Sequence, residues 1–202
     1  FDQGSVKFHI KTRLPEENTK IMVKISFEDT LIVQDVINIS GTEITRVFDI
    51  FQKKIFRGCT HGPGWTWTPE NPNLFDVTLT LVNNNEIIDE ADSYFGMRKI
   101  HTENGKVYLN NRPYYQRLVL DQGYWPDSLM TAPSDEDFKK DIILAKEMGF
   151  NGCRKHQKIE DCRFLYWADK LGYIVWSEMP STISYDSNSV ARYRGLEFSW
   201  VD

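Results

Sequence analysis

The sequence predicts a two-part fold, a β-sandwich followed by a parallel α/β unit. Residues 1–100 hold short runs rich in Val, Ile, Thr and Phe, separated by charged or Asn/Gly-containing breaks. Residues 134–180 instead read as helix, strand, helix and strand, and a glycine closes each helix. This change of pattern predicts two domains, at residues 1–103 and 104–202.

The first half shows the alternation expected of half-buried strands. Apolar and polar residues alternate almost strictly over Lys7–Lys11 and Met22–Phe27. A loop with three prolines and two glycines, residues 61–73, interrupts the pattern. About seven short antiparallel strands in roughly 100 residues are typical of an immunoglobulin-like sandwich. The expected strands are 6–14, 21–27, 30–39, 43–51, 74–82 and 94–100.

The second half has helix signals and buried parallel strands. Ser134 and Asp137 form a capping box at the start of a helix that Gly149 ends. A second helix runs to Leu171 and stops at Gly172. The residues expected to face the sheet are Phe138, Ile142, Ala145 and Met148 from the first helix, and Phe164, Ala168 and Leu171 from the second.

Strands are expected around these helices. Residues 107–109 and 114–120 flank a tight turn at 110–113, and strands follow at 150–154 and 173–176. The last strand is apolar throughout, as a parallel strand buried on both faces should be. A (β/α)8 barrel needs roughly 250 residues, so we expect the incomplete beginning of one, and a chain that is a fragment.

Composition narrows the class of protein. The net charge of −5 argues against nucleic acid as a partner. No apolar run approaches the roughly 18 residues that span a membrane, and no signal peptide opens the chain, which leaves the compartment open. Because the chain begins at Phe1 rather than Met, we expect a missing N-terminal region.

Cofactor, metal and disulfide signals are absent from the sequence. There are three cysteines and no CxxC pair, so neither a disulfide framework nor a zinc site is predicted. Cys153 and Cys162 are expected to pack in the interior. No nucleotide-binding or metal-binding motif and no nucleophile elbow occurs, and we expect no cofactor.

Five segments, in order along the chain, carry a resemblance to glycoside hydrolase family 2, the group of β-galactosidases, β-glucuronidases and β-mannosidases. Residues 67–75 resemble its W-x-P-x-N-P-x-L-Y segment, and 94–100 its F-G-x-R-x-[VI] strand. Residues 108–113 resemble its L-N-G-x-P hairpin, 148–154 its M-G-x-N-x-[VI]-R strand, and 171–180 its third barrel strand. The resemblance implies the central sandwich and the start of a TIM barrel.

The segments also depart from the family pattern. Asn111 stands where the hairpin glycine is usual. Arg154-Lys155-His156 is one residue shorter than the family's Arg-x-x-His, and the loop 121–127 lacks the histidine usual in galactosidases. The identity of the sugar that the enzyme would recognise therefore stays open at this point.

The resemblance implies a retaining β-glycosidase that removes a terminal β-linked sugar. Such enzymes need two carboxyl groups about 5–5.5 Å apart. The family places them on the fourth and seventh barrel strands, beyond the last residue here. The one Asn-Glu pair, Asn85-Glu86, is expected in a hairpin turn. We therefore expect no catalytic residue in this chain and an inactive fragment. A homo-oligomer is an open alternative for the full-length protein.

Polar residues at the ends of the barrel strands are the candidate substrate-binding residues, because active sites lie at that face. Arg154 is expected either to contact the sugar or to pair with a carboxylate beneath it, and His156 to bind a hydroxyl. Asp121 is a weaker candidate. Glu178 is expected to support neighbouring strand-end residues. Trp125, with Tyr124, either stacks on a sugar ring or anchors its loop.

Two other functions remain open at this point. One is a non-catalytic sandwich module that binds carbohydrate or protein; the parallel α/β unit argues against it, because such a module needs no barrel strands. The other is a complete small α/β enzyme, which would need three strands to form a closed core.

Overall fold

The computed structural model describes residues 1–13, 18–50 and 64–180. The chain divides into two compact units, Phe1–Tyr114 and Tyr115–Asp202. The first is an antiparallel β-sandwich and the second is built from parallel β-α-β units, which confirms the predicted fold class. The predicted domain boundary between residues 103 and 104 stays a prediction.

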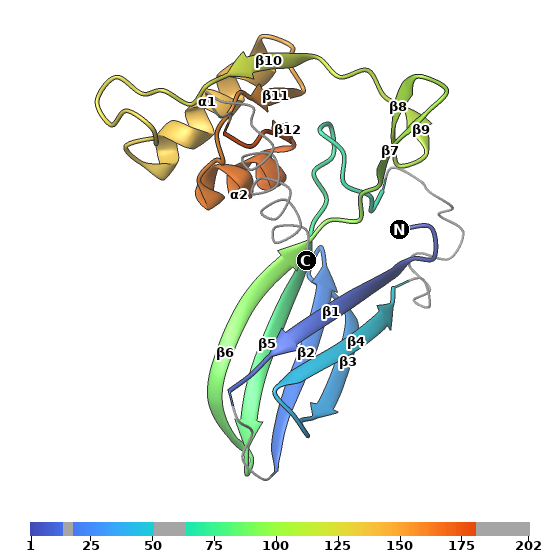
Figure 1. Ribbon diagram of the computed structural model, residues 1–202. Helices are drawn as coiled ribbons and strands as arrows, with labels where there is room; N and C mark the ends of the chain where they lie inside the picture. Colours follow the sequence, from blue (N-terminus) through green and yellow to red (C-terminus); the bar gives the residue numbers. More distant parts are fainter. Residues whose placement is uncertain (14–17, 51–63, 181–202) are drawn as a thin grey trace, which may run out of the picture. The chain divides into compact units, whose positions relative to one another are not determined.

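The first unit packs two sheets against each other. One pairs β1 (Ser5–Lys11) with β4 (Glu43–Asp49). The other has four antiparallel strands in the order β3-β2-β5-β6, and the two-stranded sheet lies across its face (Figure 1). The bounds of these four strands are Thr30–Asn38 for β3, Thr19–Phe27 for β2, Phe75–Asn83 for β5 and Glu86–Phe95 for β6.

Alternation along β2 builds the core of the sandwich. Every second residue of this strand, from Thr19 to Phe27, is buried. Phe75 of β5 stacks on Phe95 of β6 at a ring separation of 4.9 Å, and Phe8 of β1 meets Phe95 edge-on at 6.1 Å. The apolar positions of the period-two pattern therefore meet between the sheets.

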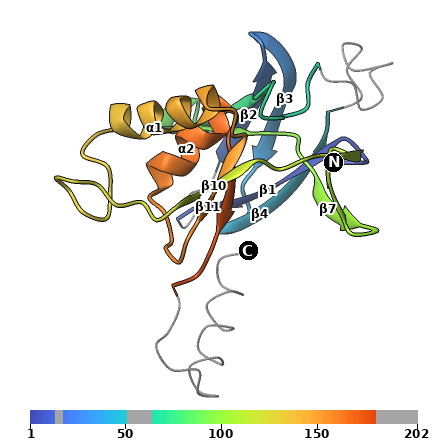
Figure 2. The ribbon, with the colours of Figure 1, turned by 90° about the horizontal axis from the view of Figure 1, so that it is seen from above.

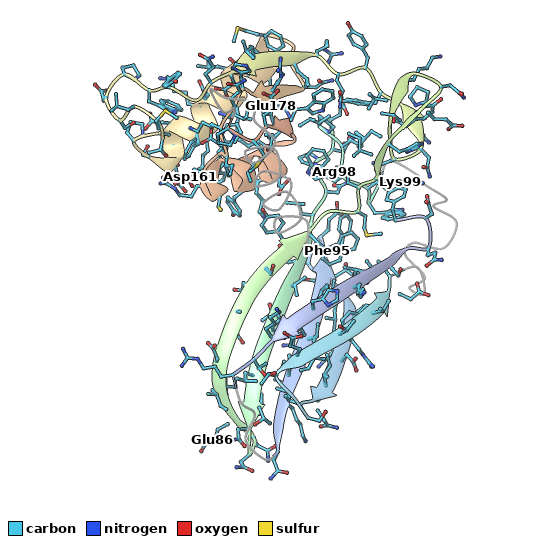
Figure 3. The ribbon with its side chains drawn as sticks, in the orientation of Figure 1. Glu86, Phe95, Arg98, Lys99, Asp161 and Glu178 are labelled. Carbon is cyan, nitrogen blue, oxygen red and sulfur yellow. The ribbon has the colours of Figure 1, made fainter. Side chains whose placement is uncertain are left out.

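The hairpin turn expected at Asn85-Glu86 joins β5 to β6. Asn84 and Asn85 both have positive φ, 47° and 69°, the conformation that a tight two-residue hairpin turn requires. Glu86 follows at the far end of β6 from Phe95 (Figure 3). The turn is thus formed by Asn84 and Asn85, and Glu86 is the first residue of β6.

A single strand over 94–100 was predicted and is wrong. β6 ends at Phe95, and the next strand is β7 (Ile100–Glu103). The residues between them pack on Trp67 instead: a Cβ at Gly96 would lie 3.2 Å from Trp67 Cβ, and the Arg98 guanidinium lies 4.8 Å from its ring centre. Packing on Trp67 therefore takes the place of strand pairing between Phe95 and Ile100.

A small hairpin completes the first unit. β7 pairs with β8 (Lys106–Leu109), which pairs with β9 (Arg112–Pro113). The tight turn predicted at 110–113 has Asn110 and Asn111 at φ 52° and 63°. The buried Asn110 side chain accepts from Lys99 N at 3.0 Å and donates to Trp67 O at 2.9 Å. It therefore holds the turn against the Trp67 loop.

The second unit has three parallel strands in the order β10-β11-β12, with both helices on one side (Figure 2). Buried residues of the helices pack on Val119, Cys153 and Val175 of the sheet. Burial raises the pKa of the Cys153 thiol to about 12, in keeping with the expected packing role. In chain order the elements are β10 (Leu118–Asp121), α1 (Asp135–Glu147), β11 (Gly152–Lys155), α2 (Cys162–Leu171) and β12 (Ile174–Ser177).

The predicted helix ends are largely confirmed. Ser134 caps α1 by accepting from Asp137 N, and Gly172 ends α2 at φ 73°. Two expectations of burial are wrong. Met148 lies just after the last residue of α1 and is exposed, and Cys162 is exposed because it is the first residue of α2, beside its N-cap Asp161.

The predicted strand ends at Leu14 and Phe51, the start of the loop at 61–63, and Cys59 lie outside the described residues. Within the described ranges, no helix is long and apolar enough to cross a membrane.

Candidate functional site at the strand ends

The ends of β10, β11 and β12 present different side chains to the two faces of the sheet. Register aligns Leu120, Arg154 and Trp176 in one row. Leu120 and Trp176 are 59% and 47% exposed, so this row lies on the face that the helices leave uncovered. The next residue of β11, Lys155, is buried with its Nζ 3.9 Å from the Phe164 ring centre. Alternation along β11 thus separates an open face from a helix-covered one.

Arg154 and Glu178 form an ion pair on the open side. Arg154 Nε donates to Glu178 Oε1 across neighbouring strands, and both side chains are partly exposed. This hydrogen bond, with the Arg154 charge, lowers the pKa of Glu178, so the carboxylate is ionised at neutral pH. Glu178 follows the end of β12 (Figure 3). Glu178 thus contacts a neighbouring strand-end residue, and its supporting role in the site stays a prediction.

His156 lies at the same strand ends. Its backbone N–H donates to Asp121 O at 2.8 Å, which extends the pairing of β10 and β11 by one bond. Its Nδ1 lies 3.2 Å from Gln122 Nε2. Its charge also contributes to the lowered pKa of Glu178. Arg154, His156 and Glu178, three of the five predicted site residues, are therefore brought together.

Asp121 and Trp125 have other partners. Asp121 Oδ2 lies 2.5 Å from Lys155 Nζ, and Asp121 Oδ1 accepts from Gly123 N at 2.7 Å. Trp125 is half-buried, meets the Phe138 ring edge-on at 6.1 Å and exchanges backbone hydrogen bonds with Leu129. Of the two alternatives left open for Trp125, these contacts favour the anchoring one.

Sequence reasoning missed a cluster of buried charges beneath the strand ends. Lys155, Lys158 and Glu160 are all buried, and Glu160 contacts both lysines at 2.7 and 3.0 Å. The sequence did hold a signal for Lys155. Since Arg154 faces the open side, its neighbour must point toward the helices, where a charge needs a partner.

Burial and charge act in opposite directions on Lys155. Burial alone would lower its pKa, but hydrogen bonds and charges from Asp121 and Glu160 outweigh burial and raise the pKa. The ammonium group is therefore charged at neutral pH.

Asp121 and Glu160 also illustrate a false positive for catalysis. Both contact Lys155 Nζ, at 2.5 and 2.7 Å, so two carboxylates meet at one place, as the two carboxyl groups of a retaining glycosidase do. The Glu160 side chain, however, is only 1% exposed, and the buried lysine occupies the space between the two carboxylates. A substrate could not reach the pair.

The described strand ends can therefore bind polar groups. Arg154 and His156 offer hydrogen-bond donors beside an ionised carboxylate. Among the residues with described positions, no three His, Cys, Asp or Glu side chains gather as a metal site would require.

Comparison with known proteins gives a consistent result. The family model described as glycosyl hydrolases family 2 matches residues 1–98. A β-galactosidase of Thermoanaerobacter pseudethanolicus is 30% identical over 153 residues, which is 74% of this chain and 21% of that enzyme.

Solved structures match over more of the chain. A β-glucuronidase of Bacteroides uniformis is 25% identical with a TM-score of 0.68, over 90% of this chain and 22% of that one. A β-glucuronidase of Parabacteroides merdae has a TM-score of 0.73 over 94% of this chain and 23% of that one, and its 15% identity shows the fold alone.

This chain thus spans about a fifth of the length of these relatives. These two solved structures match at least nine-tenths of this chain and therefore extend over both of its units. The chain belongs to glycosyl hydrolase family 2.

Proposed function

We propose that this chain is part of a retaining β-glycosidase that removes a terminal β-linked sugar, with a β-galactoside as the first candidate substrate. The observation that carries the proposal is the group of Arg154, His156 and Glu178 at the ends of parallel strands, the position of the active site in barrels of this type. Family membership supplies the reaction class.

The charge of this group favours a neutral sugar over a uronate. A glucuronide carries a carboxylate, which a cationic side chain at the pocket would bind. Arg154 is already paired with Glu178, and the buried Lys155 and Lys158 are both paired with Glu160. A galactoside needs only neutral hydrogen-bond partners.

The decisive experiment assays the full-length protein on chromogenic β-galactoside, β-glucuronide and β-mannoside. We expect the highest kcat/KM with the β-galactoside. A preference for the glucuronide would overturn the assignment of the sugar, and no turnover of any β-glycoside would overturn the reaction class. The 202-residue chain alone is expected to be inactive, because it spans only about a fifth of the length of its relatives.

Replacing Arg154 tests the site itself. Arg154→Met in the full-length protein removes a charged hydrogen bond and frees Glu178, and we expect kcat/KM to fall about 10–100-fold. Arg46→Met is a matched control, because Arg46 pairs with Asp35 in the sandwich at nearly the same side-chain exposure, 51% and 27% against 48% and 27%. Equal kinetics in both variants would place Arg154 outside the sugar pocket.

A further inference from the structure

A buried charge network connects the loops that follow β10 and β11. Lys155 Nζ lies 2.5 Å from Asp121 Oδ2 and 2.7 Å from Glu160 Oε2. Lys158 Nζ lies 3.0 Å from the other oxygen of Glu160. The side chains of Lys155 and Glu160 are 3% and 1% exposed, so water does not screen these contacts.

The network holds the loop of residues 122–133 at two places. Lys158 Nζ donates to Gly123 O at 3.3 Å near the start of the loop and to Met130 O near its end. Thr131 adds a hydrogen bond to Asp161 Oδ2 at 3.2 Å. Both parts of a long loop are therefore fixed to residues 156–161, the loop after β11.

Gly123 allows the loop to approach the network closely. Its φ is +67°, and a Cβ there would lie 2.6 Å from Lys158 Nζ and 2.9 Å from Glu160 Oε2. Both distances are shorter than non-bonded contacts permit. Any side chain at this position would push the loop away from the two charges.

The balance between the desolvation cost and the attraction of these charges indicates what the network does. Two lysines and two carboxylates balance in charge, but taking them out of water cancels most of the attraction gained. Apolar side chains of the same volume would stabilise the fold as well, whereas directional ion pairs fix positions. The fixed positions adjoin the site, because Lys155 lies between Arg154 and His156 in the chain.

We propose that Lys155 and Glu160 are positioning residues that hold loop 122–133 as a fixed wall of the sugar pocket. The loop carries Gln122, whose amide contacts His156, and the exposed ring of Tyr124. This inference rests on the proposed function, since it assigns the loop to the pocket of that same site.

The test compares two Glu→Gln variants of the full-length protein. Glu160→Gln keeps the shape and removes the buried charge. Glu136→Gln is the control, because Glu136 pairs with Lys139 on the exposed surface of α1. In Glu160→Gln we expect amide hydrogen exchange to be about tenfold faster in peptides covering 122–133, with α1 and α2 unchanged. We expect kcat/KM to fall about tenfold, mainly through kcat, because a misplaced wall misorients the bound sugar.

Gly123→Ala perturbs the same contact from the loop side and serves if Glu160→Gln folds poorly. We expect it to raise exchange in the same peptides. The double variant should lose little more kcat/KM than the worse single variant, because both changes break one unit.

Each way in which the proposal about loop 122–133 could be wrong predicts a different experimental result. Additive losses of kcat/KM would contradict a shared network. Faster exchange throughout residues 115–180 would show a merely structural role. Faster loop exchange with unchanged kcat/KM would show that the loop is no wall of the pocket. Failure of the proposed function would appear instead as no turnover by the unmodified protein.

Discussion

Two buried asparagines add side-chain hydrogen bonds to backbone segments at the ends of strand pairs. Asn110 joins the turn between β8 and β9 to the Trp67 loop. Asn151, just before β11, accepts from Arg117 N at 2.8 Å and donates to Tyr115 O at 2.9 Å. An amide side chain offers both a donor and an acceptor, so it pairs with an incoming backbone as a strand would.

Removing the Asn151 side chain tests this role. Asn151→Ala leaves the Arg117 N–H and the Tyr115 C=O without these part-buried hydrogen bonds, and we expect a loss of about 1–2 kcal/mol in the free energy of unfolding. The measurement is urea-induced unfolding followed by tryptophan fluorescence. Asn38→Ala, at an exposed position of β3, is the control and should change little. An unchanged unfolding midpoint for Asn151→Ala would contradict the idea that the Asn151 side chain holds this backbone segment in place.

Individual site residues differed in how far the sequence predicted them. The sequence predicts that Arg154, His156 and Glu178 lie together, because strand ends in parallel sheets converge on one edge. Their contact with a sugar stays a prediction. The partners of Lys155 could not be found in this way. Asp121 ends β10 and Glu160 lies in the loop before α2, and only packing of the second unit brings them to one nitrogen atom.

The two helices of the second unit are tied to each other at their ends. Lys146 of α1 donates to Leu171 O at 2.5 Å and to Gly172 O at 2.9 Å, satisfying carbonyls at the end of α2. At the other end of α2, Asp161 accepts from Arg163 N at 2.9 Å as the N-cap. Each terminus of α2 therefore has a side-chain partner.

The N-cap of α2 gives a prediction that depends on pH. Hydrogen bonds from Arg163 lower the pKa of Asp161 from 3.8 to about 2. A lowered pKa in the folded state means that the stabilisation is present above about pH 4 and is lost as the pH falls through the folded pKa. We expect Asp161→Ala to cost about 1 kcal/mol at pH 7 and much less near pH 2.

Chemical unfolding at the two pH values, with Asp127→Ala as an exposed loop control, measures this difference. A cost for Asp161→Ala that is equal at both pH values would contradict the pairing with Arg163.

Helices were predicted more accurately than strand ends, for a physical reason. The capping residues Ser134 and Gly172 act on their own helix, so their signal is local. The end of β6 at Phe95 depends instead on Trp67, 28 positions earlier in the chain, through Gly96. A contact of this kind does not change the alternation of apolar and polar residues in the strand that it ends.

At the scale of the whole molecule, the sheet of the second unit has one uncovered face. Parallel sheets in proteins are normally covered on both faces. Here the helices cover one, and the other presents Leu120 and Trp176 to solvent in the described part of the chain. Exposed apolar side chains on a flat sheet promote association.

We therefore expect the isolated 202-residue chain to self-associate at micromolar concentration and to bind a hydrophobic dye. Leu120→Lys should reduce both effects, whereas Ile87→Lys, at an exposed position of the sandwich strand β6, should not. Analytical ultracentrifugation and dye fluorescence measure these outcomes. Equal association of the two variants would mean that the sheet face plays no part in it.

The alternation along β11 also limits how this protein can change during evolution or engineering. Arg154 and Lys155 serve opposite faces, one peptide bond apart. An insertion or deletion within the strand would exchange the two faces and bring the buried lysine to the surface. Substitution is thus the tolerated route, and a library aimed at new sugar specificity should vary residue identity here while keeping the length of β11 fixed.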